Sequence, residues 1–303
     1  MATTLIAVIV ALVLGHVAPS LAASVRHYAW YGNWLRWLDS RFPEGSFWRG
    51  RYGIALALLP PLVALGLFQL ALDKPLLGLA GLLLGVVVLF YTWGPRDLDL
   101  DVDAIVEARD PVARREAAAR LWPEGAGVSL DGSSMVDAVF RNGLRRWFGV
   151  LFWFLLLGPV GALLYRLAVL SAEGEYARTL PAETVAGARG LLALLDWPVA
   201  QLMTLSMALV GNFDTVLGAW RDAGGASFRL DADFLGAAAR ASVKSELAEE
   251  AMEYAESGVA TSTAIMATAP ELPELRDAMS LVWRILLLWL AVIALFVIAG
   301  WVA

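Results

Sequence analysis

The sequence predicts an all-α membrane protein, a polytopic chain with five or six membrane helices joined by amphipathic cytoplasmic or interfacial helices. Hydrophobic residues make up 59% of the 303 residues and charged residues only 17%, against roughly 45–50% and about 25% in ordinary globular chains. Five apolar stretches approach the ~20 residues that a helix needs to cross a bilayer. Thirteen tryptophans suit a chain with two membrane–water interfaces.

The five stretches lie near residues 5–22, 52–72, 75–94, 147–170 and 281–302. The first resembles a signal peptide around Ala18–Ala22, but no Lys or Arg precedes it, so we expect a retained helix. A sixth stretch, near 196–219, has four polar residues among apolar ones: Asp196, Gln201, Asn212 and Asp214. It is predicted to span the membrane, to lie in the interface or to pack against the bundle.

The distribution of basic residues predicts the orientation. Residues 23–51 contain five arginines and residues 95–146 contain eight, whereas the link at 73–74 contains one lysine. Because cytoplasmic loops are enriched in Lys and Arg, we expect a multi-pass protein of a bacterial inner membrane with its N-terminus outside and both Arg-rich loops inside. The side of the membrane on which residues 220–280 lie depends on whether the sixth stretch crosses the bilayer.

We expect five consecutive segments: an N-terminal anchor and helical hairpin (1–94), an Arg-rich helical loop (95–146), a central membrane core (147–220), an acidic amphipathic segment (221–280) and a C-terminal membrane helix (281–303). In the loop, Asp110 is expected to cap a helix starting at Pro111. Ser134 precedes a second helix that runs into the fourth span. In the acidic segment, an apolar stripe predicts a helix over 233–257 that Gly258 ends: Leu235, Ala239, Val243, Leu247, Ala251 and Tyr254.

Charged residues inside membrane spans are candidates for function, because burying them in hydrocarbon is costly. Arg166 lies in the fourth span. It is expected either to snorkel to the headgroups or to find an acidic partner, for which Asp196 and Asp214 are the candidates. His16 poses the same question in the first span. Arg284, near the start of the last span, is expected to anchor the helix at the interface.

The composition excludes several classes of function. No cysteine is present, which removes disulfides, thiolate nucleophiles and cysteine-bound metals. Two histidines, His16 and His27, leave little scope for a histidine metal site. Neither Lys74 nor Lys244 follows a glycine, so there is no phosphate-binding P-loop. A net charge of −6 without a basic cluster outside the membrane-flanking loops argues against nucleic-acid binding. We therefore predict no catalytic residue, metal or cofactor.

Two acidic clusters have alternative interpretations. The alternating acids between Asp97 and Asp103 invite a calcium loop, but the glycine at position six and the glutamate at position twelve of an EF-hand are missing. A solvated helix start is expected instead. Five glutamates between Glu246 and Glu256 lie opposite the apolar stripe. A solvated face is expected there, with a divalent ion or a basic partner as the alternatives.

The stretch Trp147–Arg166, which contains Gly158-Pro159, resembles the AmpE family and its distant relative, the CbiB/CobD family of cobalamin biosynthesis. Three further stretches resemble AmpE: 93–102, 209–220 and 281–289. AmpE-like proteins are inner-membrane modulators of β-lactamase induction, encoded beside the cytoplasmic amidase AmpD of muropeptide recycling. The resemblance therefore implies a membrane protein that acts in this setting.

The CbiB/CobD family joins an amino-alcohol to a corrinoid carboxylate with ATP and Mg²⁺. It carries a Glu-Ser…Glu-Asn…Asp pattern before its fourth span, where this chain has Asp137-Ala138, Arg141-Asn142 and Arg145. Its Asp-Asp pair and Pro-x-Arg correspond here to Leu195-Asp196 and Pro198-Val199-Ala200. Because two acids have become Arg, the resemblance implies that ligation of a hard cation by oxygen donors is lost.

The leading hypothesis is an AmpE-like protein without catalysis that senses or scaffolds through its Arg-rich loop. Its candidate ligand or partner residues are Arg141, Asn142, Arg145, Arg166, Asp196, Asn212, Asp214 and His16. Expected partners are membrane lipids and either AmpD or an anionic muropeptide or lipid-linked ligand. An alternative of equal weight is that these arginines only determine the orientation of the chain in the membrane. The alternatives are a CbiB/CobD-like Mg-ATP-dependent membrane ligase and a membrane transporter or lipid-binding protein.

Overall fold

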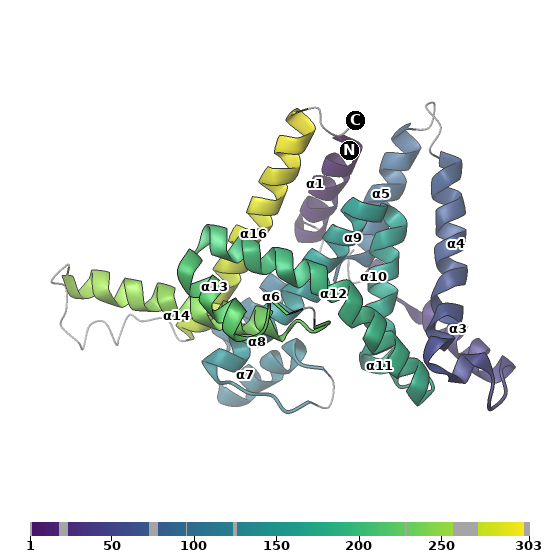
Figure 1. Ribbon diagram of the computed structural model, residues 1–303, viewed down its shortest axis with the longest axis horizontal. Helices are drawn as coiled ribbons and strands as arrows, with labels where there is room; N and C mark the ends of the chain where they lie inside the picture. Colours follow the sequence, from purple (N-terminus) through teal and green to yellow (C-terminus); the bar gives the residue numbers. More distant parts are fainter. Residues whose placement is uncertain are drawn as a thin grey trace. The chain divides into compact units, whose positions relative to one another are not determined.

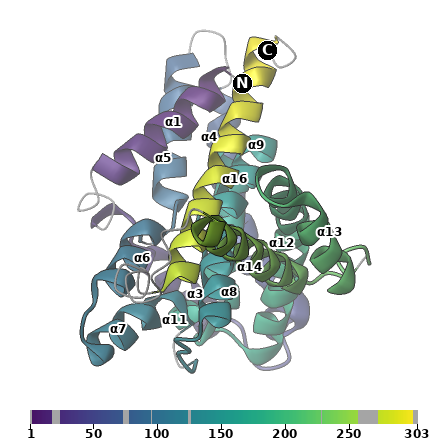
Figure 2. The ribbon, with the colours of Figure 1, turned by 90° about the vertical axis from the view of Figure 1, so that its left-hand side faces the viewer.

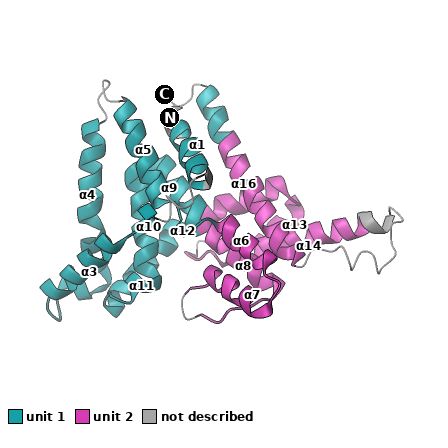
Figure 3. Cartoon of the chain, turned by 180° about the vertical axis from the view of Figure 1, so that it is seen from behind, with its two compact units in different colours: residues 1–97, 145–196, 292–303 teal, residues 98–144, 197–291 magenta. Residues whose placement is uncertain are grey.

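The computed structural model describes residues 2–17, 24–72, 78–94, 96–123, 126–227, 229–256 and 272–299. Every regular element in these ranges is a helix. The chain forms two compact units, each assembled from segments that are distant in the sequence (Figure 3). Unit 1 comprises residues 1–97, 145–196 and 292–303, and unit 2 comprises residues 98–144 and 197–291. Helices α12 (Ala182–Val210) and α16 (Pro273–Ile298) run from one unit into the other.

The apolar helices confirm the predicted class of all-α membrane protein. Three helices are long and apolar enough to cross a bilayer: Arg51–Leu72, Ala182–Val210 and Pro273–Ile298. Shorter apolar helices cover Leu5–Gly15, Leu79–Thr92 and Pro159–Ala172. Within unit 1, α1 (Ala2–Val17) packs along α5 (Gly78–Thr92), and α4 (Ile54–Leu72) packs along α10 (Pro159–Ala172). The cleavage-like stretch at 18–22 lies outside the described residues.

Unit 1 has one apolar end and one polar end. The start of α1, the end of α4 and the start of α5 lie together at one end (Figures 1 and 3). Helices α3 (Ala29–Arg41) and α11 (Gly174–Ala177) lie at the other, with the short 3-10 helices η1 (Phe47–Arg49) and η2 (Arg51–Gly53). Two hydrogen bonds connect this end to α10 and α12: Tyr31 Oη of α3 shares one with Ser171 Oγ of α10 at 2.6 Å, and Thr184 Oγ1 of α12 donates to Trp48 O of η1 at 2.6 Å.

The predicted fourth span, 147–170, is not a single helix. It is divided into α9 (Gly149–Leu157) and α10 at Gly158, whose φ of 66° favours glycine. A Cβ on Gly149 would lie 2.0 Å from the Tyr165 ring, and one on Gly161 would lie 2.0 Å from Trp153 O. These approaches pair residues symmetrically about Leu157, so α9 and α10 form a tight antiparallel hairpin. The expectation of one continuous span was wrong because Gly-Pro reverses the chain.

The hairpin enters the membrane region of unit 1 and returns to the same end. Arg166 follows Gly158 by eight residues, about 12 Å of helix, and already contacts Thr92, the last residue of α5. At the turn, Val160 N donates to Gln69 Oε1 of α4 at 3.4 Å, which gives an otherwise free helix N-terminus a partner.

The helices of the Arg-rich loop, which precede the hairpin, follow the sequence prediction closely. Asp110 Oδ2 accepts a hydrogen bond from Ala113 N at 3.0 Å, so α7 (Pro111–Ala118) has the predicted cap. The cap of α8 (Gly132–Gly143) is Asp131, which accepts from Ser134 N, and not Ser134 itself. After α8, residues Leu144–Phe148 form a π-helical turn, η5, that leads directly into α9. Such π-turns occur mostly as single insertions inside α-helices, often at functional sites.

Unit 2 is built around helix α14 (Asp233–Glu256), which confirms the predicted helix; Gly258 lies outside the described residues. Helix α14 packs against α8 and α13 (Phe213–Asp222), and Arg240 forms an ion pair with Asp137 of α8. The first half of its apolar stripe is buried, whereas Ala251 is exposed. The outer half of α14 projects from the rest of unit 2 (Figures 1 and 2).

Three further expectations concern unit 2. The sixth stretch, for which three arrangements remained open, is divided between two helices, because α12 ends at Val210 and Asn212 caps α13. Arg284, which is expected to be an interface anchor, also forms an ion pair with Glu246 of α14 at 2.5 Å. The acids of α6 (Leu98–Glu107) are not all solvated: Asp101 is buried, and Asp99 Oδ1 accepts from Trp283 Nε1 at 3.1 Å.

Candidate functional site

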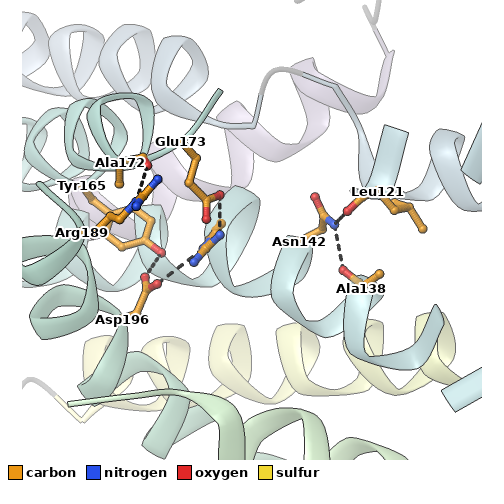
Figure 4. A network of polar contacts seen from close by, with 9 residues as sticks. Leu121, Ala138, Asn142, Tyr165, Ala172, Glu173, Arg189 and Asp196 are labelled. Atoms are coloured by element: carbon orange, nitrogen blue, oxygen red, sulfur yellow. Dashed lines mark hydrogen bonds and ion pairs between the residues drawn. The ribbon is translucent and has the colours of Figure 1, made fainter. Parts of the chain in front are cut away.

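The mouth of the α9–α10 hairpin contains an arginine between two carboxylates. Arg145 lies in the π-turn η5, Glu173 directly follows α10, and Asp196 lies in α12. Arg145 Nη1 is 2.5 Å from Glu173 Oε2, and Arg145 Nε is 3.5 Å from Asp196 Oδ2 (Figure 4). The first contact is a charge-assisted hydrogen bond. The second is an ion pair by proximity, because Nε makes no hydrogen bond there.

The two hairpin helices hold α12 against this mouth. Tyr165 Oη of α10 donates to Asp196 Oδ1 at 2.5 Å, and Trp153 Nε1 of α9 donates to Leu195 O at 3.2 Å. Asp196 is only 4% exposed, yet each of its carboxylate oxygens has a partner. We call Arg145, Tyr165, Glu173 and Asp196 the Arg145 network.

The electrostatics of the network favour a charged Arg145. Burial by itself lowers the pKa of the guanidinium, but the charges of Glu173 and then Asp196 outweigh burial and raise the pKa above its ordinary value. One guanidinium therefore neutralises part of the charge of two carboxylates. The network lies wholly within unit 1 and joins the start of the hairpin, its end and helix α12.

A second group of arginines binds the C-terminal end of α5. Arg166 Nε donates to Thr92 O at 2.6 Å, while Arg26 Nε and Nη1 donate to Phe90 O and Gly94 O at 2.9 and 2.8 Å. The last carbonyls of a helix lack partners within the helix and carry the negative end of its dipole, so they favour cations. We call Arg26, Arg166 and these carbonyl groups the α5 cap.

The α5 cap excludes snorkelling by Arg166 and gives this side chain partners inside unit 1 other than the two acids that were the candidates. The side chain is 3% exposed, so it does not snorkel to the headgroups. Its hydrogen-bond acceptors are backbone carbonyls, the second being Arg146 O at 3.5 Å, and neither Asp196 nor Asp214 is among them. Burial, and next the charge of Arg166, lower the pKa of Arg26 to about 10. Arg26 also lies over the Phe90 ring, with 4.9 Å between its Cζ and the ring centroid.

The remaining predicted residues lie elsewhere. Asn142 Nδ2 donates to Leu121 O and Ala138 O, both at 2.8 Å (Figure 4), which is a structural role in unit 2. Arg141 and Asp214 are exposed, and Asn212 Oδ1 caps α13 by accepting from Thr215 N. His16 lies in α1, but its side chain is outside the described residues.

Three residues of these groups were not predicted from the sequence: Arg26, Tyr165 and Glu173. Tyr165 and Glu173 carried a usable signal, since one precedes the flagged Arg166 and the other is the first acid after the hairpin. Arg26 carried none, because it is one of five arginines in its loop. Only the packing distinguishes it from the others.

Two curated proteins are similar to part of this chain, and both are named cobalamin biosynthesis protein CobD. The protein from Stutzerimonas stutzeri is 30% identical over 187 residues, which cover 58% of this chain and 59% of the relative. The protein from Chromobacterium violaceum is 30% identical over 186 residues, covering 57% and 56%. The chain thus spans somewhat over half the length of these relatives. No family model and no solved structure matches it.

Proposed function

We propose that this chain is a multi-pass inner-membrane protein related to the CobD proteins that modulates a cellular process without catalysis, as AmpE-like proteins do. The Arg145 network carries this proposal. Residues 145 and 196 are positions at which the resemblance implies acids in the CbiB/CobD enzymes. In this chain they lie together as an Arg–Asp ion pair.

The chemistry of the network does not suit the Mg²⁺ and nucleotide that the CbiB/CobD resemblance implies. A divalent hard cation needs several oxygen ligands, but the Arg145 guanidinium already lies between Glu173 and Asp196. Asp137, the other acid at a matching position, is paired with Arg240. Within the described ranges, no three Asp, Glu or His side chains are grouped to hold a metal ion.

Calorimetry with a charge-restoring variant tests this proposal. Arg145→Asp would place a third carboxylate beside Glu173 and Asp196, and we expect the variant to bind Mg²⁺ or Mn²⁺. The native protein, titrated with Mg²⁺ and Mg-ATP in the same detergent, is expected to release no heat of binding. Mg²⁺-dependent nucleotide binding by the native protein would contradict the proposal.

A second candidate function is a CobD-type membrane ligase, and the names of both curated relatives favour it. Deleting the gene in its own bacterium separates the two candidates. Loss of cobalamin-dependent growth, restored by the native gene and not by Asp196→Asn, would support the ligase. Altered β-lactamase induction with normal cobalamin-dependent growth would support the modulator.

As the partner of a modulator we propose either the amidase AmpD or an anionic muropeptide or lipid-linked ligand. Arg115 and Arg141 are exposed in unit 2, and exposed guanidiniums suit carboxylate or phosphate groups. Arg115→Gln with Arg141→Gln should then weaken binding of the partner and change induction. Unchanged binding and induction would leave these arginines with a role in topology alone.

The topology we propose places residues 233–256 in the cytoplasm. Helix α14 packs on α8 of the Arg-rich loop, and the hairpin begins and ends at one end of unit 1. Helix α12, although long and apolar enough to cross a bilayer, would then begin and end on that same side without crossing. The cysteine-free chain allows single cysteines to be labelled from outside intact cells. Lys74→Cys should be labelled, whereas Glu44→Cys and Glu250→Cys should be protected until the cells are opened.

A further inference from the structure

Helix α3 lies at the depth where two membrane helices of unit 1 end. Trp30 Nε1 donates to Tyr91 Oη at 2.7 Å, one residue before the end of α5. Trp34 Nε1 donates to Ala57 O at 3.1 Å, in the first turn of α4. The inner face of α3 is buried through Tyr31, Leu35 and Leu38. Helix α3 therefore bridges the first turn of α4 and the last turn of α5.

The surface of residues 24–52 combines exposed aromatic rings with arginines. Four aromatic side chains are largely exposed: Trp30 at 41%, Trp37 at 51%, Phe47 at 58% and Tyr52 at 72%. Three exposed arginines accompany them: Arg36, Arg41 and Arg51. We call these seven residues the aromatic–basic face. Residues 24–52 hold five arginines against two acids, and one of those acids, Asp39, is paired with Arg49 at 3.3 Å.

We propose that the aromatic–basic face binds anionic phospholipids of the leaflet next to the polar end of unit 1. Tryptophan and tyrosine rings prefer the headgroup region, where one part of the ring contacts hydrocarbon and the other contacts water. Guanidinium groups bind phosphate oxygens with two parallel hydrogen bonds. The face also continues into the candidate membrane helix Arg51–Leu72, so a lipid fits its position better than a soluble acidic protein does.

Lipid binding to the purified protein tests the basic half of the face. Native mass spectrometry would measure the binding of phosphatidylglycerol and of phosphatidylcholine to the native protein and to the triple variant Arg36→Gln, Arg41→Gln, Arg51→Gln. The matched control replaces three exposed arginines of unit 2 that have no proposed binding role: Arg109→Gln, Arg120→Gln and Arg221→Gln. We expect about fivefold weaker phosphatidylglycerol binding per arginine removed from the face, since each basic side chain near an anionic surface contributes about 1 kcal/mol.

Equal losses in the face variant and the control would overturn the proposal. So would efficient competition by inorganic phosphate at the same concentration, because the ligand would then be a free anion.

A depth measurement tests the aromatic half without depending on the triple variant. A nitroxide label on Trp37→Cys is expected to relax faster with oxygen, which concentrates in lipid, than with a water-soluble nickel complex. The same label on Glu44→Cys, an exposed position at the same end of unit 1, should show the reverse. If both labels responded as in water, the face would point to the cytoplasm, as a docking surface for a soluble partner requires, and the proposal would fail.

Discussion

The Arg145 network and the α5 cap hold arginines at the same helical hairpin in different ways. Arg145 lies between two carboxylates, whereas Arg166 and Arg26 bind backbone carbonyls. Carbonyl groups have no formal charge, so the α5 cap stays net positive, while the Arg145 network carries an excess of carboxylate. The difference shows that a buried guanidinium needs oriented oxygen atoms more than it needs a counter-ion, and that a helix C-terminus supplies them.

Removing Arg145 should have the largest effect on stability. Arg145→Leu leaves Asp196 buried beside Glu173 without its cation, and breaking a buried pair in this way costs about 3–5 kcal/mol. We expect the lower end, about 3 kcal/mol, because Glu173 is partly exposed. The free energy of unfolding in an SDS titration measures the loss. Adding Asp196→Asn should recover part of it, and a purely additive double variant would contradict the pairing.

Disturbing the hairpin should affect both arginine sites together. Gly161→Ala would bring a Cβ to within 2.0 Å of Trp153 O, a backbone atom that cannot move without opening the hairpin. We expect a loss of about 2–3 kcal/mol, as for other overpacked positions. Gly218→Ala is the matched control, since a Cβ there meets nothing within 4 Å. Similar stabilities of the two variants would argue against a tight antiparallel hairpin.

Removing Arg166 should cost less than removing Arg145. Arg166→Leu leaves the carbonyls of Thr92 and Arg146 without this donor, and a hydrogen bond to a charged group contributes about 1.5–3 kcal/mol. We expect a loss of about 2 kcal/mol in the same SDS titration. In contrast to Arg145→Leu, this variant should not become more stable when Asp196→Asn is added. Rescue by that second change would mean that the two sites are one electrostatic network.

The smallest effect on stability is expected at Asp131, an exposed carboxylate outside both arginine sites. The Ser133 hydroxyl, and next the Ser134 backbone N–H, hold the pKa of Asp131 below its usual value. Its stabilising contribution is present above the unfolded pKa of about 3.9 and disappears as the pH falls through the lowered pKa. Asp131→Asn should therefore be less stable than the native protein at about pH 7 and nearly equal once the pH falls below the lowered pKa of Asp131. A difference that persists in acid would refute this interpretation.

Local patterns in the sequence determined most of the helices and some of their ends. The apolar stretches at 52–72 and 75–94 correspond to α4 and α5, because hydrocarbon-length runs have few alternatives to a helix. Asp110 with Pro111 capped α7 as expected, since a cap depends on four adjacent residues. The class of all-α membrane protein followed from composition alone.

Tertiary structure decided the path of the fourth stretch and the partners of every buried charge. Hydropathy has the same value for a spanning helix and for a hairpin of equal length, so only the close approaches at Gly149 and Gly161 distinguish them. The sequence marked Arg145, Arg166 and Asp196 as unusual. That Arg145 meets Asp196 and Arg166 meets Thr92 depends on contacts across 51 and 74 positions of the chain, and such separations leave no local pattern.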